Sequence, residues 1–168
     1  SDPACMVPPV IDAEACERLR KCLEHLPSGT RVLFSGEVPQ NGHYVSPTLL
    51  EVDRPDHPLM QKELFGPILC VIPAADFSTA LHIANDSPYA LTAAVYSRLP
   101  SHLERARREL RVGNLYLNRN CTGAVVGRQP FGGFKLSGVG LKAGGPQYLT
   151  QFCHPRLVSE NTVRRGFT

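Results

Sequence analysis

Two stretches of the chain combine a rigid backbone with groups that could bind a ligand. In the first, Glu63 lies just before Phe65, Gly66 and Pro67. A glycine followed by a proline forms a rigid turn, which could direct a carboxylate and an aromatic ring into a cleft. A carboxylate is a natural acceptor for the two hydroxyls of a ribose. A lone carboxylate before a strand is more commonly a solvated residue or a charge at a helix end, so both interpretations stay open.

The second stretch is a glycine-rich run in the last third of the chain. Eight glycines lie between residues 123 and 145, too many for a helix or a central strand. Their spacing matches neither phosphate-binding fingerprint, and the run does not clearly connect a strand to a helix, which argues against a pyrophosphate site. A loop whose backbone amides hold a small anion, such as a carboxylate, is one interpretation. A tight connector is the other.

The cysteines and histidines predict neither a metal centre nor a disulfide scaffold. The six cysteines and six histidines are scattered, without the spacing of a metal site. Reduced thiols are therefore the better interpretation in a chain of this length. Cys121 follows a predicted strand end, where parallel sheets place reactive groups. No histidine or carboxylate lies close in sequence to activate it, so we favour an inert thiol.

The composition excludes several classes of protein. Of the 168 residues, 42% are hydrophobic and 20% are charged, which excludes a disordered tail, a coiled coil or a collagen-like repeat and suits one domain. The net charge is only +3, and the arginines between residues 105 and 111 are interspersed with glutamates, which favours a solvated helix face over a nucleic-acid footprint. No apolar run approaches the ~20 residues needed to span a bilayer. The first residues show no signal peptide.

The elements that must position the two stretches follow from periodicity. Apolar spacing predicts helices over residues 15–26, 77–84 and 101–111. We expect Asp76 to cap the second helix, a Ser101–Glu104 capping box to open the third, and Gly113 to terminate it. Strands are predicted over residues 31–34, 44–52, 68–72, 91–96 and 115–117. Segment 68–72 is continuously apolar, as in a strand buried on both faces. The alternation of strands and helices predicts an α/β fold with a parallel sheet.

Both stretches resemble signatures of the aldehyde dehydrogenase superfamily. Segment 63–67, Glu-Leu-Phe-Gly-Pro, is similar to the superfamily's nucleotide-ribose motif, and segment 130–138 is similar to its C-terminal signature. Segments 113–120, 123–129 and 142–149 narrow the resemblance to the Δ1-pyrroline-5-carboxylate dehydrogenase branch. That branch includes the dehydrogenase half of bifunctional proline-utilisation proteins. The similarity extends over nearly the whole chain.

The resemblance implies an activity and a role for each site residue. The activity is the NAD-dependent oxidation of L-glutamate γ-semialdehyde to glutamate, in which a cysteine attacks the aldehyde and water hydrolyses the thioester. By position, Glu63 would hold the nicotinamide ribose and Phe65 would pack near the nicotinamide. Gly123 and Ala124 would present backbone amides to the α-carboxylate of the substrate. Phe131 would pack on the aliphatic stem of the substrate.

The resemblance also sets the expected organisation of the chain. Nothing here matches the superfamily's nucleophile segment, nucleotide-binding domain or general-base glutamate, so we expect no catalytic residue in this chain and no activity from it alone. Residues 1–148 would form the parallel-sheet part of the catalytic domain, and residues 149–168 an extended oligomerisation arm and tail. The exposed edge of this arm predicts self-association. The expected location is the bacterial cytoplasm, or the mitochondrial matrix if the source is a eukaryote.

Two other functions stay open. Some multidomain proline-utilisation proteins contain a superfamily domain that has lost its chemistry and serves in assembly. Such a module needs none of Glu63, Phe65, Gly123 and Phe131, so their presence argues against it. The chain could also belong to a dehydrogenase for another semialdehyde, such as succinate semialdehyde, but segment 142–149 argues against that.

Overall fold

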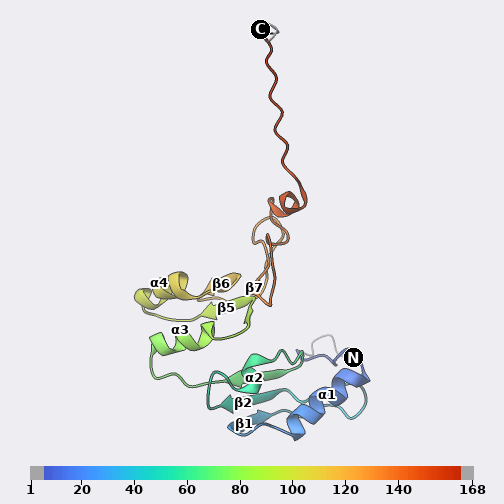
Figure 1. Cartoon of the computed structure of the whole chain (residues 1–168). Helices are drawn as coiled ribbons and strands as arrows, with labels where there is room; N and C mark the ends of the chain where they lie inside the picture. Colours follow the sequence, from blue (N-terminus) through green and yellow to red (C-terminus); the bar gives the residue numbers. More distant parts are fainter. Residues whose placement is uncertain (1–5, 164–168) are drawn as a thin grey trace.

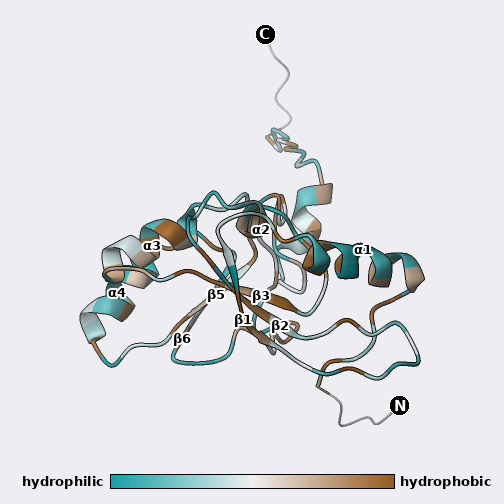
Figure 2. Cartoon of the chain, turned by 90° about the horizontal axis from the view of Figure 1, so that it is seen from below, coloured by the Kyte–Doolittle hydropathy of each residue, from teal (hydrophilic) through white to brown (hydrophobic). Residues whose placement is uncertain are grey.

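A computed structural model describes residues 6–163 and shows a mixed α/β fold (Figure 1). Residues 1–5 of the expected catalytic portion and residues 164–168 of the expected arm lie outside the described residues. Within the described range, no helix is both long and apolar enough to cross a bilayer. Figure 2 shows the strands largely in the hydrophobic colour and α1 largely in the hydrophilic one.

The first sheet has three strands, β1 (Thr30–Ser35), β2 (Thr48–Val52) and β3 (Ile68–Val71). β1 pairs with β2 in antiparallel orientation, and β2 pairs with β3 in parallel orientation. The helix α1 (Ala13–Glu24) packs on this sheet, and the short helix α2 (Pro58–Gln61) connects β2 to β3. The core between them is built on the buried side chains of Leu19, Leu50 and Val52.

A parallel pair of strands forms a second sheet, between β5 (Thr92–Val95) and β6 (Asn114–Leu117). The helices α3 (Phe77–Asn85) and α4 (Pro100–Glu109) pack on one face of this pair. Leu115 and Leu117 point to that face, where Leu81 and Ala106 are buried. Because side chains alternate along a strand, Asn114 and Tyr116 point to the opposite face.

The glycine-rich run is attached to this second part by a third, two-stranded sheet. In it, β4 (Tyr89–Ala90) pairs with β7 (Phe134–Lys135) in antiparallel orientation. A 3₁₀-helix, η1 (Tyr148–Phe152), spans the boundary that the sequence predicted between catalytic portion and arm. Residues 153–161 contain no helix or strand, are exposed, and extend away from the sheets (Figure 1).

The prediction of a parallel sheet is corrected in which strands pair with one another. The β5–β6 pair is parallel as predicted. However, among residues 6–163 no ladder joins β3 to β5, and β3 pairs with β2 in a sheet whose β1–β2 pair is antiparallel, so the strands lie in separate sheets. The expectation that segment 68–72 is buried on both faces is also wrong, because Leu69 is 62% exposed. An apolar run identifies a strand, but it carries no information on which segment covers its second face or pairs with its free edge.

The predicted cap of α3 is confirmed, whereas the predicted cap of α4 is wrong. Asp76 caps α3 as predicted and accepts a hydrogen bond from the Thr79 amide at 2.7 Å. The expected capping box of α4 is wrong, because that helix begins at Pro100 and its N-cap Leu99 makes no side-chain hydrogen bond. Proline suits the first helical position, since its backbone has no N–H to satisfy there, and this moves the start ahead of Ser101.

Gly113 does not terminate α4, contrary to the prediction. The helix ends at Glu109, with Leu110 as its C-cap. A Cβ atom at position 113 would instead collide with the carbonyl oxygen of Gly132. Gly113 therefore permits the close approach of the glycine-rich run to the start of β6.

Candidate functional site

The turn that carries Glu63 and Phe65 is held in place by α1 and by the sheet. The Arg18 guanidinium donates a hydrogen bond to the Leu64 carbonyl at 2.8 Å. Gly66 lies so close to α1 that a Cβ atom there would come within 2.6 Å of Leu19 Cδ1. Directly after the turn, the Thr48 amide donates to the Pro67 carbonyl at 2.9 Å. These contacts fix the backbone on both sides of Phe65.

Phe65 itself has an unusual backbone conformation. Its φ is +57°, a backbone conformation that residues other than glycine rarely adopt, and its side chain is 79% exposed. A large aromatic side chain held in a strained conformation and turned to solvent gains little from packing within the chain. Strain of this kind concentrates at ligand-binding sites, where the surrounding structure maintains it.

Glu63 and Phe65 line the same pocket, which is compatible with the interpretation that the turn directs both into a cleft. The pocket has a volume of about 310 Å³, and its other walls are Leu59, Lys62, Leu64, Gly66, Ile68 and Cys70. Burial raises the pKa of the Cys70 thiol, with a smaller contribution from the thiol of Cys22, so this part of the wall is uncharged at neutral pH. An exposed carboxylate beside a mainly apolar wall suits a ligand with both hydroxyl groups and a ring.

The loop that carries Gly123 and Ala124 begins where β6 ends. Asn118 has a φ of +52°, and its side-chain amide exchanges two hydrogen bonds with the backbone of Ser97. Farther along, Arg119 donates to the Thr122 carbonyl at 3.3 Å. The Gln129 amide, oriented to satisfy its neighbours, accepts from Arg119 Nη1 at 3.1 Å and donates to the Gly123 carbonyl at 3.0 Å. The side chains of Arg119 and Gln129 therefore hold the backbone of the loop in place.

This bracing leaves two consecutive amides available. Within residues 6–163, the structure shows no hydrogen bond from the backbone N–H of Gly123 or of Ala124. Gly123 has a φ of +79°, which L side chains rarely adopt. Adjacent amides in such a turn can bind an anion together. The predicted anion loop is thus compatible with this geometry.

Phe131 lies on the return strand of the same glycine-rich segment. It forms an isolated antiparallel bridge with Ala143, with two backbone hydrogen bonds of 2.9 and 3.0 Å. Its side chain is 39% exposed and lines a separate pocket of about 180 Å³. Among the described residues, no hydrogen bond connects Phe131 with Glu63 or Phe65. The predicted site residues therefore fall into two groups of sequence neighbours, the Glu63–Phe65 turn and the glycine-rich run, which the structure does not join. The pocket of Phe131 includes neither Gly123 nor Ala124.

Sequence reasoning missed the residues that support both groups. Arg18 is separated from Leu64 by 46 positions, and Asn114 donates to the Pro130 carbonyl from 16 positions away. Tyr116 is buried under the Arg119 guanidinium, and its hydroxyl has no hydrogen-bond partner among the described residues. No local pattern marks these residues, since their partners are distant in sequence. Cys121 is exposed in the loop.

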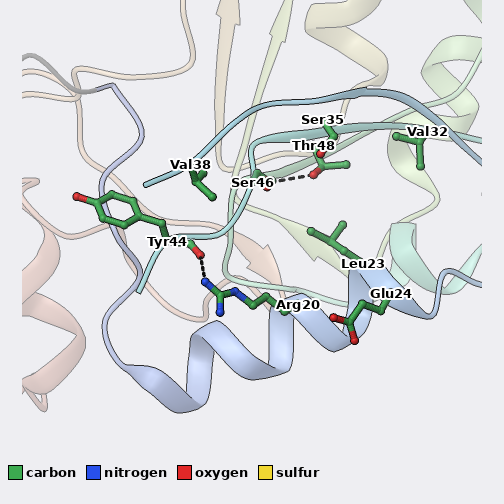
Figure 3. A pocket seen from close by; sticks show the side chains of 9 residues that line it. All are labelled: Arg20, Leu23, Glu24, Val32, Ser35, Val38, Tyr44, Ser46 and Thr48. Carbon is green, nitrogen blue, oxygen red and sulfur yellow. Dashed lines mark hydrogen bonds between the residues drawn. The ribbon is translucent and has the colours of Figure 1, made fainter. Parts of the chain in front are cut away.

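Another pocket lies away from all of the predicted site residues. It has a volume of about 260 Å³ and lies between α1 and β1, where Arg20 donates to the Tyr44 carbonyl at 3.0 Å (Figure 3). Within the part of the chain that the structure describes, no group of three or more histidine, cysteine, aspartate or glutamate side chains could hold a metal ion.

Comparison with protein families and curated proteins gives a consistent result. Residues 1–158 match the model of the aldehyde dehydrogenase family. A relative from Halalkalibacterium halodurans, named 1-pyrroline-5-carboxylate dehydrogenase 1, is 46% identical over 153 residues, which are 90% of this chain and 30% of that protein. A 1-pyrroline-5-carboxylate dehydrogenase from Geobacillus sp. is 44% identical over 95% of this chain and 31% of its own length. The chain thus spans about 30% of the length of these curated relatives.

Solved structures show the same relationship. Proline utilization A from Bdellovibrio bacteriovorus superposes with a TM-score of 0.88 and 48% identity, over 95% of this chain and 17% of that chain. A 1-pyrroline-5-carboxylate dehydrogenase from Thermus with bound NAD superposes with a TM-score of 0.80 and 46% identity, over 86% of this chain and 28% of that one.

Proposed function

The chain belongs to the aldehyde dehydrogenase family, and we propose that it forms the cofactor-ribose and substrate-carboxylate part of an NAD-dependent enzyme. The reaction is the oxidation of L-glutamate γ-semialdehyde, the open form of Δ1-pyrroline-5-carboxylate, to glutamate in proline catabolism. The observation that carries this proposal is the exposed Glu63–Phe65 turn with its left-handed phenylalanine. The names of the relatives support the choice of substrate.

The residues of the Glu63 pocket fit NAD. The Glu63 carboxylate is exposed in this pocket. It would accept hydrogen bonds from the two ribose hydroxyls, while the Phe65 ring would pack near the nicotinamide. NAD, when bound, supplies the hydride acceptor for the oxidation. Arg18 and Gly66 keep the turn fixed, so the backbone that carries the carboxylate and the ring is ordered before the cofactor arrives. This order reduces the entropic cost of binding.

The glycine loop provides the specificity for a substrate with an α-carboxylate. The amides of Gly123 and Ala124 donate to that carboxylate, and Phe131 packs on the aliphatic stem. A substrate without the carboxylate leaves both amides unpaired when the site closes, which disfavours simple aldehydes.

The nucleophile and the general base come, in this proposal, from a longer polypeptide of which this chain is a part. The chain spans about 30% of the curated relatives, which leaves room for those residues. We therefore expect no turnover from the chain alone. The relatives compared above are bacterial proteins, which supports the bacterial cytoplasm as the location.

Self-association through the C-terminal segment belongs to the same proposal. Leu157 and Val158 are 91% and 71% exposed on a stretch without regular structure. An apolar extended segment with free backbone groups can add to a sheet edge of a second copy.

The test follows absorbance of reduced nicotinamide in the full-length enzyme that contains this chain. L-glutamate γ-semialdehyde is compared with an aldehyde of equal length that lacks the α-carboxylate. We expect kcat/KM to be at least about a hundredfold higher for the semialdehyde, since the two amides otherwise lose their partner when substrate covers them. Equal rates would contradict the role of Gly123 and Ala124.

A non-catalytic assembly module is distinguished by the same assay. Such a module binds no NAD and turns over neither aldehyde, whereas the proposed enzyme turns over at least one. A preference for succinate semialdehyde would instead indicate a different substrate within the same family.

A further inference from the structure

His57 is completely buried and uses both ring nitrogens. Its side chain has 0% exposure, a rare state for a residue of this type. Nδ1 accepts a hydrogen bond from the Leu59 amide at 3.2 Å, which makes His57 the N-cap of α2. Nε2 lies 3.2 Å from the Ser28 carbonyl and 3.1 Å from Thr30 Oγ1.

These contacts determine the tautomer of His57. Nδ1 faces the N–H of Leu59, a donor, so it must be the acceptor. Nε2 therefore holds the proton and donates it to the Ser28 carbonyl, a pure acceptor. Serine and asparagine are common N-caps, but their side chains are too short to cap α2 and also reach the start of β1. The imidazole thus connects α2 to the first sheet, at the end away from the Phe65 turn.

The helix that His57 caps leads directly to the proposed cofactor site. α2 ends at Gln61, Lys62 is its C-cap, and Glu63 follows. Leu59, whose amide donates the hydrogen bond to His57, also lines the Glu63 pocket. At the other end of α2, Gln61 donates to the carbonyls of Pro55 and Asp86 at 2.8 and 3.0 Å. The placement of α2 therefore depends on His57 and Gln61, and with it the position of the backbone that leads into Glu63.

We propose that His57 is a positioning residue for the cofactor: as the neutral Nε2–H tautomer it fixes α2 on β1 and so sets the direction in which Glu63 meets the ribose. This inference rests on the proposed role of Glu63 in NAD binding. His57 itself touches no ligand, because it is fully buried behind α2.

The test compares the variants His57→Asn, Glu63→Gln and the double variant in the full-length enzyme. Asparagine keeps the cap of α2 but cannot reach Ser28 and Thr30. We expect the KM for NAD and the calorimetric Kd for NAD to rise about fivefold in His57→Asn, as for the loss of one hydrogen bond, with an unchanged KM for the semialdehyde. His25→Asn, at the exposed C-cap residue of α1, is the matched control and leaves all constants unchanged.

The double variant separates positioning from a general loss of structure. If His57 acts through Glu63, the double variant binds NAD no more weakly than Glu63→Gln alone. Additive effects, or a parallel loss for NAD and semialdehyde together, would overturn the inference. An unchanged Kd for NAD in His57→Asn would overturn it as well. An unchanged Kd in Glu63→Gln would instead remove the proposed cofactor role of Glu63, and the inference with it.

Discussion

At the scale of single residues, the strongest indication of function is a strained backbone conformation that packing within the chain does not explain. Phe65 has a positive φ, which costs a non-glycine residue about 1–3 kcal/mol, yet its ring is mostly exposed. Glycine would adopt this φ without that cost. The cost is understandable if the ring packs against a ligand.

This reasoning predicts the behaviour of Phe65→Gly. We expect the free energy of unfolding to rise by up to about 1 kcal/mol, because glycine adopts this φ without strain, while NAD binding weakens. Phe65→Ala is the control, since it removes the ring and keeps the strain, and it weakens NAD binding without the gain. Urea unfolding and calorimetric titration with NAD measure the two effects. A loss of stability in Phe65→Gly would show that the ring packs within the protein.

A second prediction at this scale concerns Cys70. Burial raises the pKa of its thiol, so at neutral pH its thiolate fraction is smaller than that of an ordinary cysteine. We expect iodoacetamide to label Cys70 several-fold more slowly than the exposed Cys121 and Cys153, and the labelling of Cys70 to accelerate only at higher pH. Mass spectrometry of peptides from a pH series measures this. Equal labelling of all three at neutral pH would contradict it.

The same pKa direction has a consequence for stability. Because the pKa of the Cys70 thiol is higher in the folded than in the unfolded chain, its contribution is complete below the ordinary cysteine pKa. That contribution is lost as the pH rises through the raised value. In Cys70→Ser, the part of the alkaline loss of unfolding free energy that comes from the Cys70 thiol is absent.

At the scale of elements, the caps of α3 and α4 show how the first turn of a helix is stabilised. Asp76 accepts the Thr79 amide, and this hydrogen bond is the main reason that the pKa of its carboxyl is lowered. α4 has no side-chain cap and relies on Pro100 instead. Similar sequence signals thus led to a helix start in one case and to an interior position in the other.

These caps predict different effects of two alanine substitutions. Asp76→Ala lowers the thermal midpoint at neutral pH by roughly 2–4 °C, whereas Ser101→Ala, the control, changes it little. The contribution of the Asp76 carboxylate to stability is present above the ordinary aspartate pKa and is lost as the pH falls through the lowered pKa. The thermal midpoints of Asp76→Ala and Ser101→Ala therefore converge in acid. Thermal unfolding followed by circular dichroism at a series of pH values checks this. A difference that persists in strong acid would contradict the charge argument.

At the scale of the whole molecule, the described chain exposes surfaces that a self-sufficient domain would bury. Leu69 is exposed on the first sheet, and β3 and β5 are not paired with each other among the described residues. Parallel strands normally lie covered on both faces. Beyond η1, residues 153–161 are exposed throughout.

This exposure predicts association of the chain through its C-terminal segment. We expect size-exclusion chromatography with light scattering to show dimers or larger species, and deletion of residues 153–168 to reduce them. Val158→Pro is a sharper variant, since proline removes a backbone N–H that strand pairing needs and leaves the other residues in place. A clean monomer of the intact chain at high concentration would contradict the prediction.

Local sequence determined most of the elements and the motifs. Apolar spacing predicted α1 and α3, the Asp76 side chain predicted its own cap, and β-rich runs predicted β1, β5 and β6 within a few residues. The motif at 63–67 and the glycine-rich run also indicated the family. These features depend on residues that are neighbours in sequence, and neighbouring residues impose the same constraints wherever the segment lies.

Only the tertiary structure decided which segments meet. Four features join residues that are 13 or more positions apart, or depend on such contacts: the pairing of strands, the collision that requires Gly113 to be glycine, the support of Leu64 by Arg18 and the burial of His57. A sequence pattern gives no distance between such residues, because the chain can bring them together in many ways. The sequence therefore identified Glu63 and Phe65, whereas the packing of α1, α2 and β1 determined how they are held.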